Sequence, residues 1–208
     1  ISVIPYADGV FFQWIHFVKY GYLPWNSTRP ADGWLLNVLE SLATNYENVT
    51  ALRQILGGDF AFSDRIVLQH SPQFLTHLTE VLTAEKQNML SAALAELSDW
   101  FESIAGKYKT GKIQSSKTIE RHLWSAVLRT NADARPGRNT GAIITELLTS
   151  SLQLTPSGLH ALPKGAGGLN KFKLIRPIVA AIVGHALSGP QAIGVLDAVV
   201  VGEVGGAN

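Results

Sequence analysis

The segment that comes closest to a chemical motif is Gly106-Lys-Tyr-Lys-Thr-Gly111-Lys112, whose spacing fits the first part of a phosphate-binding loop. Such a loop also needs a Ser or Thr at the next position to hold Mg²⁺, and a strand before it. Here the next residue is Ile113, and the residues before Gly106 predict a helix. We therefore expect a basic linker at this point and no nucleotide binding.

The six histidines form no recognisable metal or catalytic pattern. None belongs to an HExxH pair, and Ser71-Pro72 interrupts the helix that would place His70 and His77 on one face. The sequence has no GxSxG turn, and it has no Cys to act as nucleophile or metal ligand. These observations predict a protein that is not an enzyme and that holds no metal ion and no other cofactor.

Charge is divided unevenly along the chain, although the net charge is only +1. Residues 1–106 contain five Lys/Arg and eleven Asp/Glu, whereas residues 107–208 contain twelve and five. The asymmetry favours packing of the two halves against each other or a solvated basic face. We expect no nucleic-acid partner, because stacking aromatics are sparse in the basic part. The candidate interaction residues there are Lys107, Lys109, Lys112, Lys117 and Arg121.

A binding module or enzyme for a nucleic acid or a phosphorylated ligand remains an open alternative for this basic half. It would use the same lysines and arginines as a cationic surface. A second alternative, considered below, is a membrane-active segment near the C-terminus.

Apolar residues recur at intervals of three and four, which is typical of helices. Ser71 before Pro72 is a typical helix start, and glycines mark helix ends after Tyr20, Leu56 and Ala105. The sequence predicts an all-α fold, a multi-helix orthogonal or bundle-like array of about eight to ten helices. The expected helices cover residues 10–20, 33–43, 49–56, 73–82, 85–105, 117–129 and 142–154.

The polar, basic stretch 107–116 is a candidate boundary between two helical subdomains. It would separate an acidic helical subdomain (1–106), which contains the Leu-Pro-Trp motif described below, from a basic and apolar helical subdomain (117–208).

Residues 174–204 are apolar and rich in glycine, but Arg176, Asp197 and Glu203 interrupt them, as do Pro177 and Pro190. A spanning helix needs about 20 predominantly apolar residues. We therefore expect no stable membrane span, and predict a packing or partner surface made of two helices, or of one helix and an apolar tail.

The most informative pattern is Phe12-Gln-Trp14-Ile-His-Phe17-Val-Lys-Tyr20-Gly21-Tyr-Leu23-Pro24-Trp25. It predicts an aromatic-rich helix that stops at Gly21 and is followed by an extended Leu-Pro turn. We expect this turn to bring Trp25 back onto the helix, so that Trp14, Leu23 and Trp25 form one buried cluster. The predicted structural motif comprises Trp14, Phe17, Gly21, Leu23, Pro24 and Trp25.

This pattern resembles the Phe-Leu-x-x-Gly-x-Leu-Pro-Trp-Trp signature of the tape-measure proteins of contractile injection systems, the phage-tail-like particles of bacteria. The resemblance covers roughly residues 10–85. Within it, residues 34–42 and 52–56 match one helical pair, and 65–71 with 74–82 match the next. Asn26 replaces the second Trp of the signature, so the role of that position is not carried over.

The resemblance implies a structural protein that takes part in particle assembly and helps to set tube length, without catalytic residues. Its partners would be the inner tube, the spike or baseplate hub and a terminal cap protein, with self-association left open. It would be present in the bacterial cytoplasm during assembly and later inside the injection particle. Because a helix rises only about 1.5 Å per residue, we expect 208 residues to be one folded segment of a larger protein.

Overall fold

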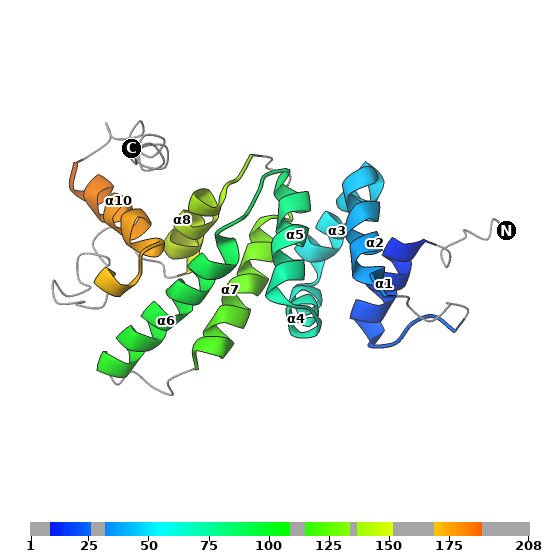
Figure 1. The fold of residues 1–208 in the computed structure, drawn as a ribbon, viewed down its shortest axis with the longest axis horizontal. Helices are drawn as coiled ribbons and strands as arrows, with labels where there is room; N and C mark the ends of the chain where they lie inside the picture. Colours follow the sequence, from blue (N-terminus) through cyan, green and yellow to red (C-terminus); the bar gives the residue numbers. More distant parts are fainter. Residues whose placement is uncertain (1–8, 26–31, 109–114, 134–136, 152–168, 189–208) are drawn as a thin grey trace, which may run out of the picture.

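The computed structural model describes residues 9–25, 32–108, 115–133, 137–151 and 169–188 (Figure 1). This described part is 79% helical and contains no strand, which confirms the predicted all-α class. Its elements are α1 (Val10–Tyr20), α2 (Trp34–Thr44), α3 (Tyr46–Gly58), α4 (Phe60–Gln69), α5 (Pro72–Thr83), α6 (Leu90–Tyr108), α7 (Ser116–Thr130), α8 (Thr140–Ser151), the short 3₁₀ turn η1 (Leu169–Lys171) and α10 (Ile175–Ser188). The array is elongated, with α1 and α2 near one end and α10 at the other (Figure 1).

Helix α1 ends, and helix α5 begins, where local sequence signals predict. Gly21 follows α1 with a φ of 80°, and its N–H donates to the Phe17 carbonyl over 2.7 Å. This left-handed conformation favours glycine and closes the helix. At the start of α5, the Ser71 hydroxyl accepts from the Phe74 N–H over 3.3 Å, and Pro72 occupies the first helical position. Both predicted termini are confirmed.

The predicted helix over residues 85–105 is wrong at both ends. Ala84 closes α5 in the left-handed conformation, with a φ of 56°, and residues 85–89 form the crossing to α6. This crossing is held by the Gln87 N–H, which donates to the Glu80 carboxylate over 3.0 Å. At the other end, α6 continues through Gly106 to Tyr108. A glycine costs about 1 kcal/mol inside a helix, which is too little by itself to end one.

Helix α3 also begins earlier than its apolar pattern predicts. The Asn45 side chain accepts from the Glu47 N–H over 2.8 Å and so caps the helix before Tyr46. The first turn of α3 is therefore polar, and an apolar periodicity does not reveal it.

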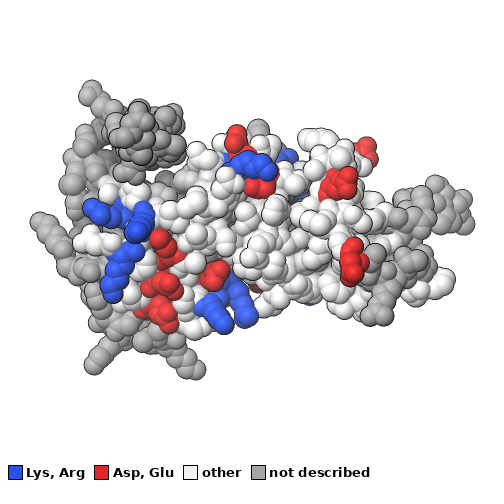
Figure 2. All heavy atoms as spheres, in the orientation of Figure 1, with Lys and Arg blue, Asp and Glu red and all other residues white. Residues whose placement is uncertain are grey.

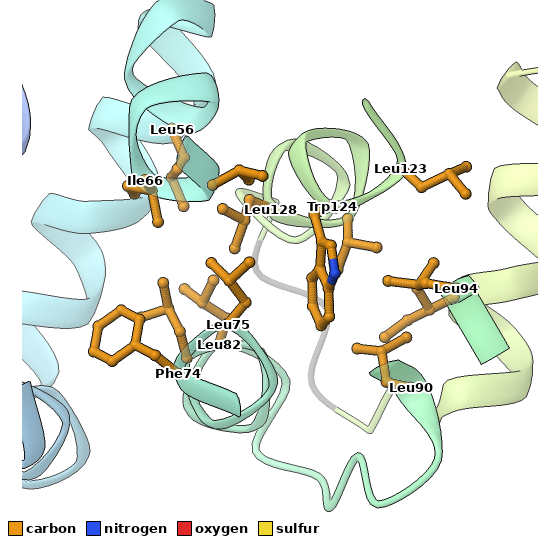
Figure 3. Close-up of a cluster of buried hydrophobic side chains, with 14 of the residues drawn as sticks. Leu56, Ile66, Phe74, Leu75, Leu82, Leu90, Leu94, Leu123, Trp124 and Leu128 are labelled. Atoms are coloured by element: carbon orange, nitrogen blue, oxygen red, sulfur yellow. The ribbon is translucent and has the colours of Figure 1, made fainter. Parts of the chain in front are cut away.

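Helix α7 lies at the centre of the hydrophobic core. Its most extensive contacts are with α6 and α4, and it also touches α3, α5 and α8. Figure 3 shows Leu128 directed toward Leu75 and Leu82 of α5, with Trp124 directed between this side and Leu90 and Leu94 of α6. Each of these side chains is buried. One helix thus contributes apolar surface to the neighbours on both sides.

The core joins helices from both sides of the predicted linker. Buried side chains of α1 to α6 and of α7, α8 and α10 belong to one hydrophobic cluster. Because residues 109–114 lie outside the described part, the boundary at 107–116 stays a prediction. What the structure shows is that the helices flanking it pack together.

A buried amide closes the junction between α5, α6 and α8. The Gln87 side chain donates to the Arg138 carbonyl over 2.7 Å and to the Thr83 hydroxyl over 3.2 Å. Its oxygen accepts from the Thr140 hydroxyl over 2.9 Å. Gln87 is fully buried, so these bonds replace the water that its amide loses on folding.

The same junction contains a buried guanidinium. Arg138 donates to the Thr130 carbonyl over 2.9 Å and to the Asn131 amide oxygen over 3.0 Å, and it forms an ion pair with Glu146. These partners come from the end of α7 and from α8. Arg138 therefore fixes how the chain passes between these two helices.

A carboxylate of α6 caps the start of helix α10. Glu96 accepts from the N–H groups of Lys173, Leu174 and Ile175 over 2.8–3.2 Å. A carboxylate is favourable here because the first N–H groups of a helix lack partners within the helix. Below this cap, Ile175 and Val179 are buried in the core.

The apolar C-terminal segment is described only in part. Pro177 lies in the first turn of α10, where its missing N–H is tolerated. The prediction that Pro177 interrupts a helix here is therefore wrong. Residues 189–204 lie outside the described part. No helix in the described ranges has the length and apolar character needed to cross a bilayer.

The junction around Gln87 yields a stability prediction. We expect Gln87→Ala to lower the free energy of unfolding by about 2–3 kcal/mol, because it leaves buried polar partners unsatisfied at about 1–3 kcal/mol each. Urea unfolding measures this value. The neighbouring Asn88 is exposed, so Asn88→Ala is the matched control and should leave stability nearly unchanged. Equal effects of the two substitutions would contradict a structural role for the buried amide.

Candidate interaction surface

The aromatic motif begins with a tryptophan that is fully buried. Trp14 of α1 lies 6.5 Å from Phe62 of α4 and 6.0 Å from Phe74 of α5, measured between ring centroids. It is also 6.2 Å from Phe11 of its own helix. Trp14 therefore anchors α1 to α4 and α5 through contacts that aromatic rings favour.

A hydrogen bond between two side chains fixes the position of Trp14. Its indole N–H donates to Nε2 of His70 over 3.0 Å. Nδ1 of His70 lies 2.9 Å from the Ile66 carbonyl, which can only accept, so the proton is on Nδ1. Nε2 can then accept from Trp14 only while the imidazole is neutral.

The environment of His70 favours this neutral form. Burial lowers the pKa of His70 below its ordinary value, and the hydrogen bond to the Ile66 carbonyl opposes this shift. The ring also stacks on Phe74, with 4.4 Å between centroids. His70 was considered above only as a possible metal ligand; its actual role is to hold α1 against the start of α5.

The chain after α1 turns away from the core. Nδ1 of His16 lies 2.9 Å from the Tyr22 carbonyl and so holds the turn against the last part of α1. Leu23 and Pro24 follow and are half-buried. On another face of α1, Phe17 meets the ring of Trp34 of α2 edge-on, at 5.8 Å.

The predicted buried cluster of Trp14, Leu23 and Trp25 is wrong. Trp14 alone belongs to the hydrophobic core, whereas Leu23 is only half-buried and Trp25 is 97% exposed. The space beside Trp14 is already filled by Phe62, His70 and Phe74. Trp25 therefore does not pack against Trp14 and lies at the surface.

The motif instead exposes aromatic side chains, which we call the motif surface: Tyr20, Tyr22 and Trp25. Tyr20 and Tyr22 are 52% and 62% exposed, and their rings lie 6.1 Å apart. The His16 ring contacts both, and the Lys19 ammonium lies 5.3 Å from the Tyr20 ring centroid. Aromatic side chains are enriched in surfaces that bind other proteins.

The structure describes only part of the predicted basic set. Lys117 and Arg121 are exposed on α7 and lie one helical turn apart. Lys107 belongs to α6, but its side chain is not described, and Lys109 and Lys112 lie outside the described residues. Most of the segment resembling a phosphate-binding loop therefore lies outside them as well.

No metal-binding geometry is found within the described ranges, where no group of three or more His, Asp or Glu side chains could hold an ion. The distinctive surface of this helical protein is thus built from aromatic rings. By its fold the protein is an all-α helical array, and its motif forms a turn with exposed aromatic side chains.

Comparison with known proteins agrees with the motif. The family model of the contractile injection system tape measure protein matches residues 7–174, which is more than half of the chain. The chain therefore belongs to this family, as its Leu-Pro-Trp motif predicts. The match also extends well beyond residue 85, where the resemblance of the motif and its helices ends. No curated protein and no solved structure matches the chain significantly.

The neutral imidazole of His70 predicts a pH dependence of stability. Because the pKa of His70 is lowered in the folded state, the unfolded chain binds more protons as the pH falls below the ordinary value of 6.5. Folding stability should therefore be complete above this value and decrease as the pH falls through it. Urea unfolding between about pH 7 and about pH 5 measures the effect.

The control for this prediction is a second histidine on the neighbouring helix. His70→Gln should flatten the loss of stability over this pH range. His77 is exposed, so His77→Gln should retain the loss. An undiminished loss in His70→Gln would show that another group causes the pH dependence.

The two tryptophans of the motif should respond differently to truncation. Trp14→Ala should lower the free energy of unfolding by about 3–5 kcal/mol, the range for a buried aromatic residue. Trp25→Ala should change it by less than about 0.5 kcal/mol, as expected for a surface residue. Urea unfolding of both variants tests this difference, and a large loss in Trp25→Ala would contradict the exposed position.

Proposed function

We propose that this protein acts as a structural component of a contractile injection particle, helps to set the length of the inner tube, and contacts other particle proteins through the motif surface. The observation that carries the proposal is the family match over residues 7–174. The role is one of assembly rather than of catalysis. Assembly takes place in the bacterial cytoplasm, and the protein then lies inside the particle.

The motif surface supports a partner contact at this position. Tyr20, Tyr22 and Trp25 follow the buried anchor Trp14 within one short segment, so the core fixes the place from which the exposed rings project. Large aromatic side chains give interfaces much of their binding energy at a low entropic cost. The inner tube, the spike or baseplate hub and the cap protein are the proposed partners, together with a second copy of this chain.

Tube length in assembled particles tests the proposal. Particles from cells that lack this chain should have no tubes or tubes of variable length when measured by electron microscopy. Tyr22→Ala combined with Trp25→Ala should cause the same defect, because it removes exposed rings without disturbing the core. Purified variant should keep the helical circular dichroism of the parent.

The matched control replaces two other exposed apolar side chains. Phe60 and Leu68 of α4 are 67% and 63% exposed and lie outside the motif. Phe60→Ala with Leu68→Ala should leave tube length normal. Tubes of normal length in cells that lack the chain would refute the proposed function, and a normal motif variant would refute the assigned surface.

A further inference from the structure

The charge asymmetry of the sequence persists at the surface of the fold. In residues 9–25 and 32–86, the exposed carboxylates outnumber the exposed lysines. The carboxylates are Asp32, Glu40, Glu47, Asp64 and Glu85, and the lysines are Lys19 and Lys86. Arg53 and Arg65 are half-buried and donate to the carbonyls of Leu82 and Lys19. The N-terminal part of the surface is therefore predominantly acidic.

The opposite end carries exposed cations. Lys171, Lys173 and Arg176 are exposed around the start of α10, and residues 169–188 contain no Asp or Glu. Figure 2 shows lysine and arginine side chains at this end of the molecule, with acidic side chains beside them, and further acidic side chains over the end formed by α1 and α2. We call Lys171, Lys173 and Arg176 the α10 basic edge.

The described ion pairs do not join the two halves. Lys86 pairs with Glu80 over 3.7 Å within the first half, and Arg138 pairs with Glu146 within the second. The packing of the acidic half against the basic half, which the sequence suggested, therefore does not involve these pairs. The charges at the two ends of the molecule face solvent.

A groove in the acidic part offers a site for a complementary surface. It has a volume of about 960 Å³ and lies between α2, α3 and α5. Its apolar wall includes Leu36 and Tyr46, which are 68% and 75% exposed. Its rim carries the exposed carboxylates of Glu40 and Glu85. Glu80 also lines the groove but is paired with Lys86, and the half-buried Arg53 is the other cation there. An exposed apolar wall with an acidic rim fits a basic partner that also has an apolar face.

The α10 basic edge supplies the complementary charge. Pro177 and Ala180 are its exposed apolar residues near Arg176, whereas Phe172 and Ile178 pack against the core of their own molecule. Within one molecule, α10 lies at the far end of the long axis from α2 (Figure 1). The α10 basic edge therefore cannot reach the groove of the same molecule, but it can reach the groove of a second copy.

We propose that the α10 basic edge of one copy docks on the acidic rim of the groove between α2, α3 and α5 of a second copy, in a head-to-tail arrangement. The two contact surfaces are different, so the contact is heterologous and leaves one groove and one basic edge available at the ends. Repetition of the contact extends a row of molecules. This inference does not depend on the proposed function.

Charge reversal at exposed positions tests the contact. One variant carries Glu40→Lys and Glu85→Lys in the groove rim, and the other carries Lys171→Glu and Arg176→Glu in the basic edge. Glu80 is left unchanged because its carboxylate accepts from the Gln87 N–H. Lys173 is left unchanged because a carboxylate at this position would lie close to that of Glu96, which accepts from the backbone N–H of the same residue. Sedimentation velocity measures the mass over a range of protein concentrations, at about 0.01 M and at about 1 M salt, where screening is strong.

The parent should associate at low salt and return to the 22.5 kDa monomer at high salt. Each two-site variant should remain monomeric at low salt, because both of its contact surfaces then carry the same sign. A mixture of the two variants should associate again, as should a single chain that carries all four substitutions. Circular dichroism confirms that each variant is folded.

Two matched controls separate the contact from a general effect of net charge. Asp32→Lys with Asp64→Lys changes the same number of charges as the rim variant, outside the groove. Lys117→Glu with Arg121→Glu on α7 changes the same number of charges as the basic-edge variant, at positions outside that edge. Both controls should associate like the parent. A parent that stays monomeric at low salt, or a four-site variant that does not recover association, would overturn the proposal.

Discussion

The fold depends on the burial of two sides of α7. Leu128 and Val127 are completely buried, and Leu123 and Trp124 almost completely, so this one helix meets α3, α4 and α5 on one side and α6 and α8 on the other. Burying a side chain of this size contributes about 1.5–3 kcal/mol. A helix that is shared in this way leaves the flanking groups of helices without independent cores. The packing of the helices around α7 therefore determines the arrangement of the array, and residues at its two ends can form binding surfaces.

Buried and half-buried polar side chains need hydrogen-bond partners, and four of them attach neighbouring elements. Gln87 and Arg138 form hydrogen bonds with the connections between α5 and α6 and between α7 and α8. Glu96 caps α10, and His70 accepts from Trp14 and so attaches α1. The bonds from Trp14 to His70, from Gln87 to Arg138 and from Leu174 to Glu96 join residues more than 50 positions apart in the sequence. Since an unpaired buried polar group costs more than a typical hydrogen bond contributes, these partners favour one arrangement of the helices over similar ones.

Sequence reasoning succeeded at two local signals, although Gly57 and Gly106 do not end their helices as predicted. The end of α1 at Gly21 and the start of α5 at Ser71-Pro72 follow from conformations that single residues prefer, and the apolar periodicity gives the helical class. It failed where the outcome depends on tertiary packing. The Leu-Pro turn was expected to return Trp25 to the helix, but the sequence does not reveal that Phe62, His70 and Phe74 already surround Trp14. The partners of Gln87, Glu96 and His70 are likewise set by contacts across the fold, to which no local pattern points.

The same division explains where partners can bind. The apolar side chains of α7 are used inside the core, whereas its exposed positions include Lys117 and Arg121. Large exposed rings gather instead after α1, and exposed cations gather at the start of α10, at opposite ends of an elongated array (Figures 1 and 2). Because these surfaces lie outside the central core, the protein can bind partners through them without rearranging that core. Contacts at the two ends also differ in kind, because aromatic rings favour a desolvated interface whereas exposed charges act mainly on association rate and partner choice. Such an arrangement suits a component that must be packed in line with its neighbours.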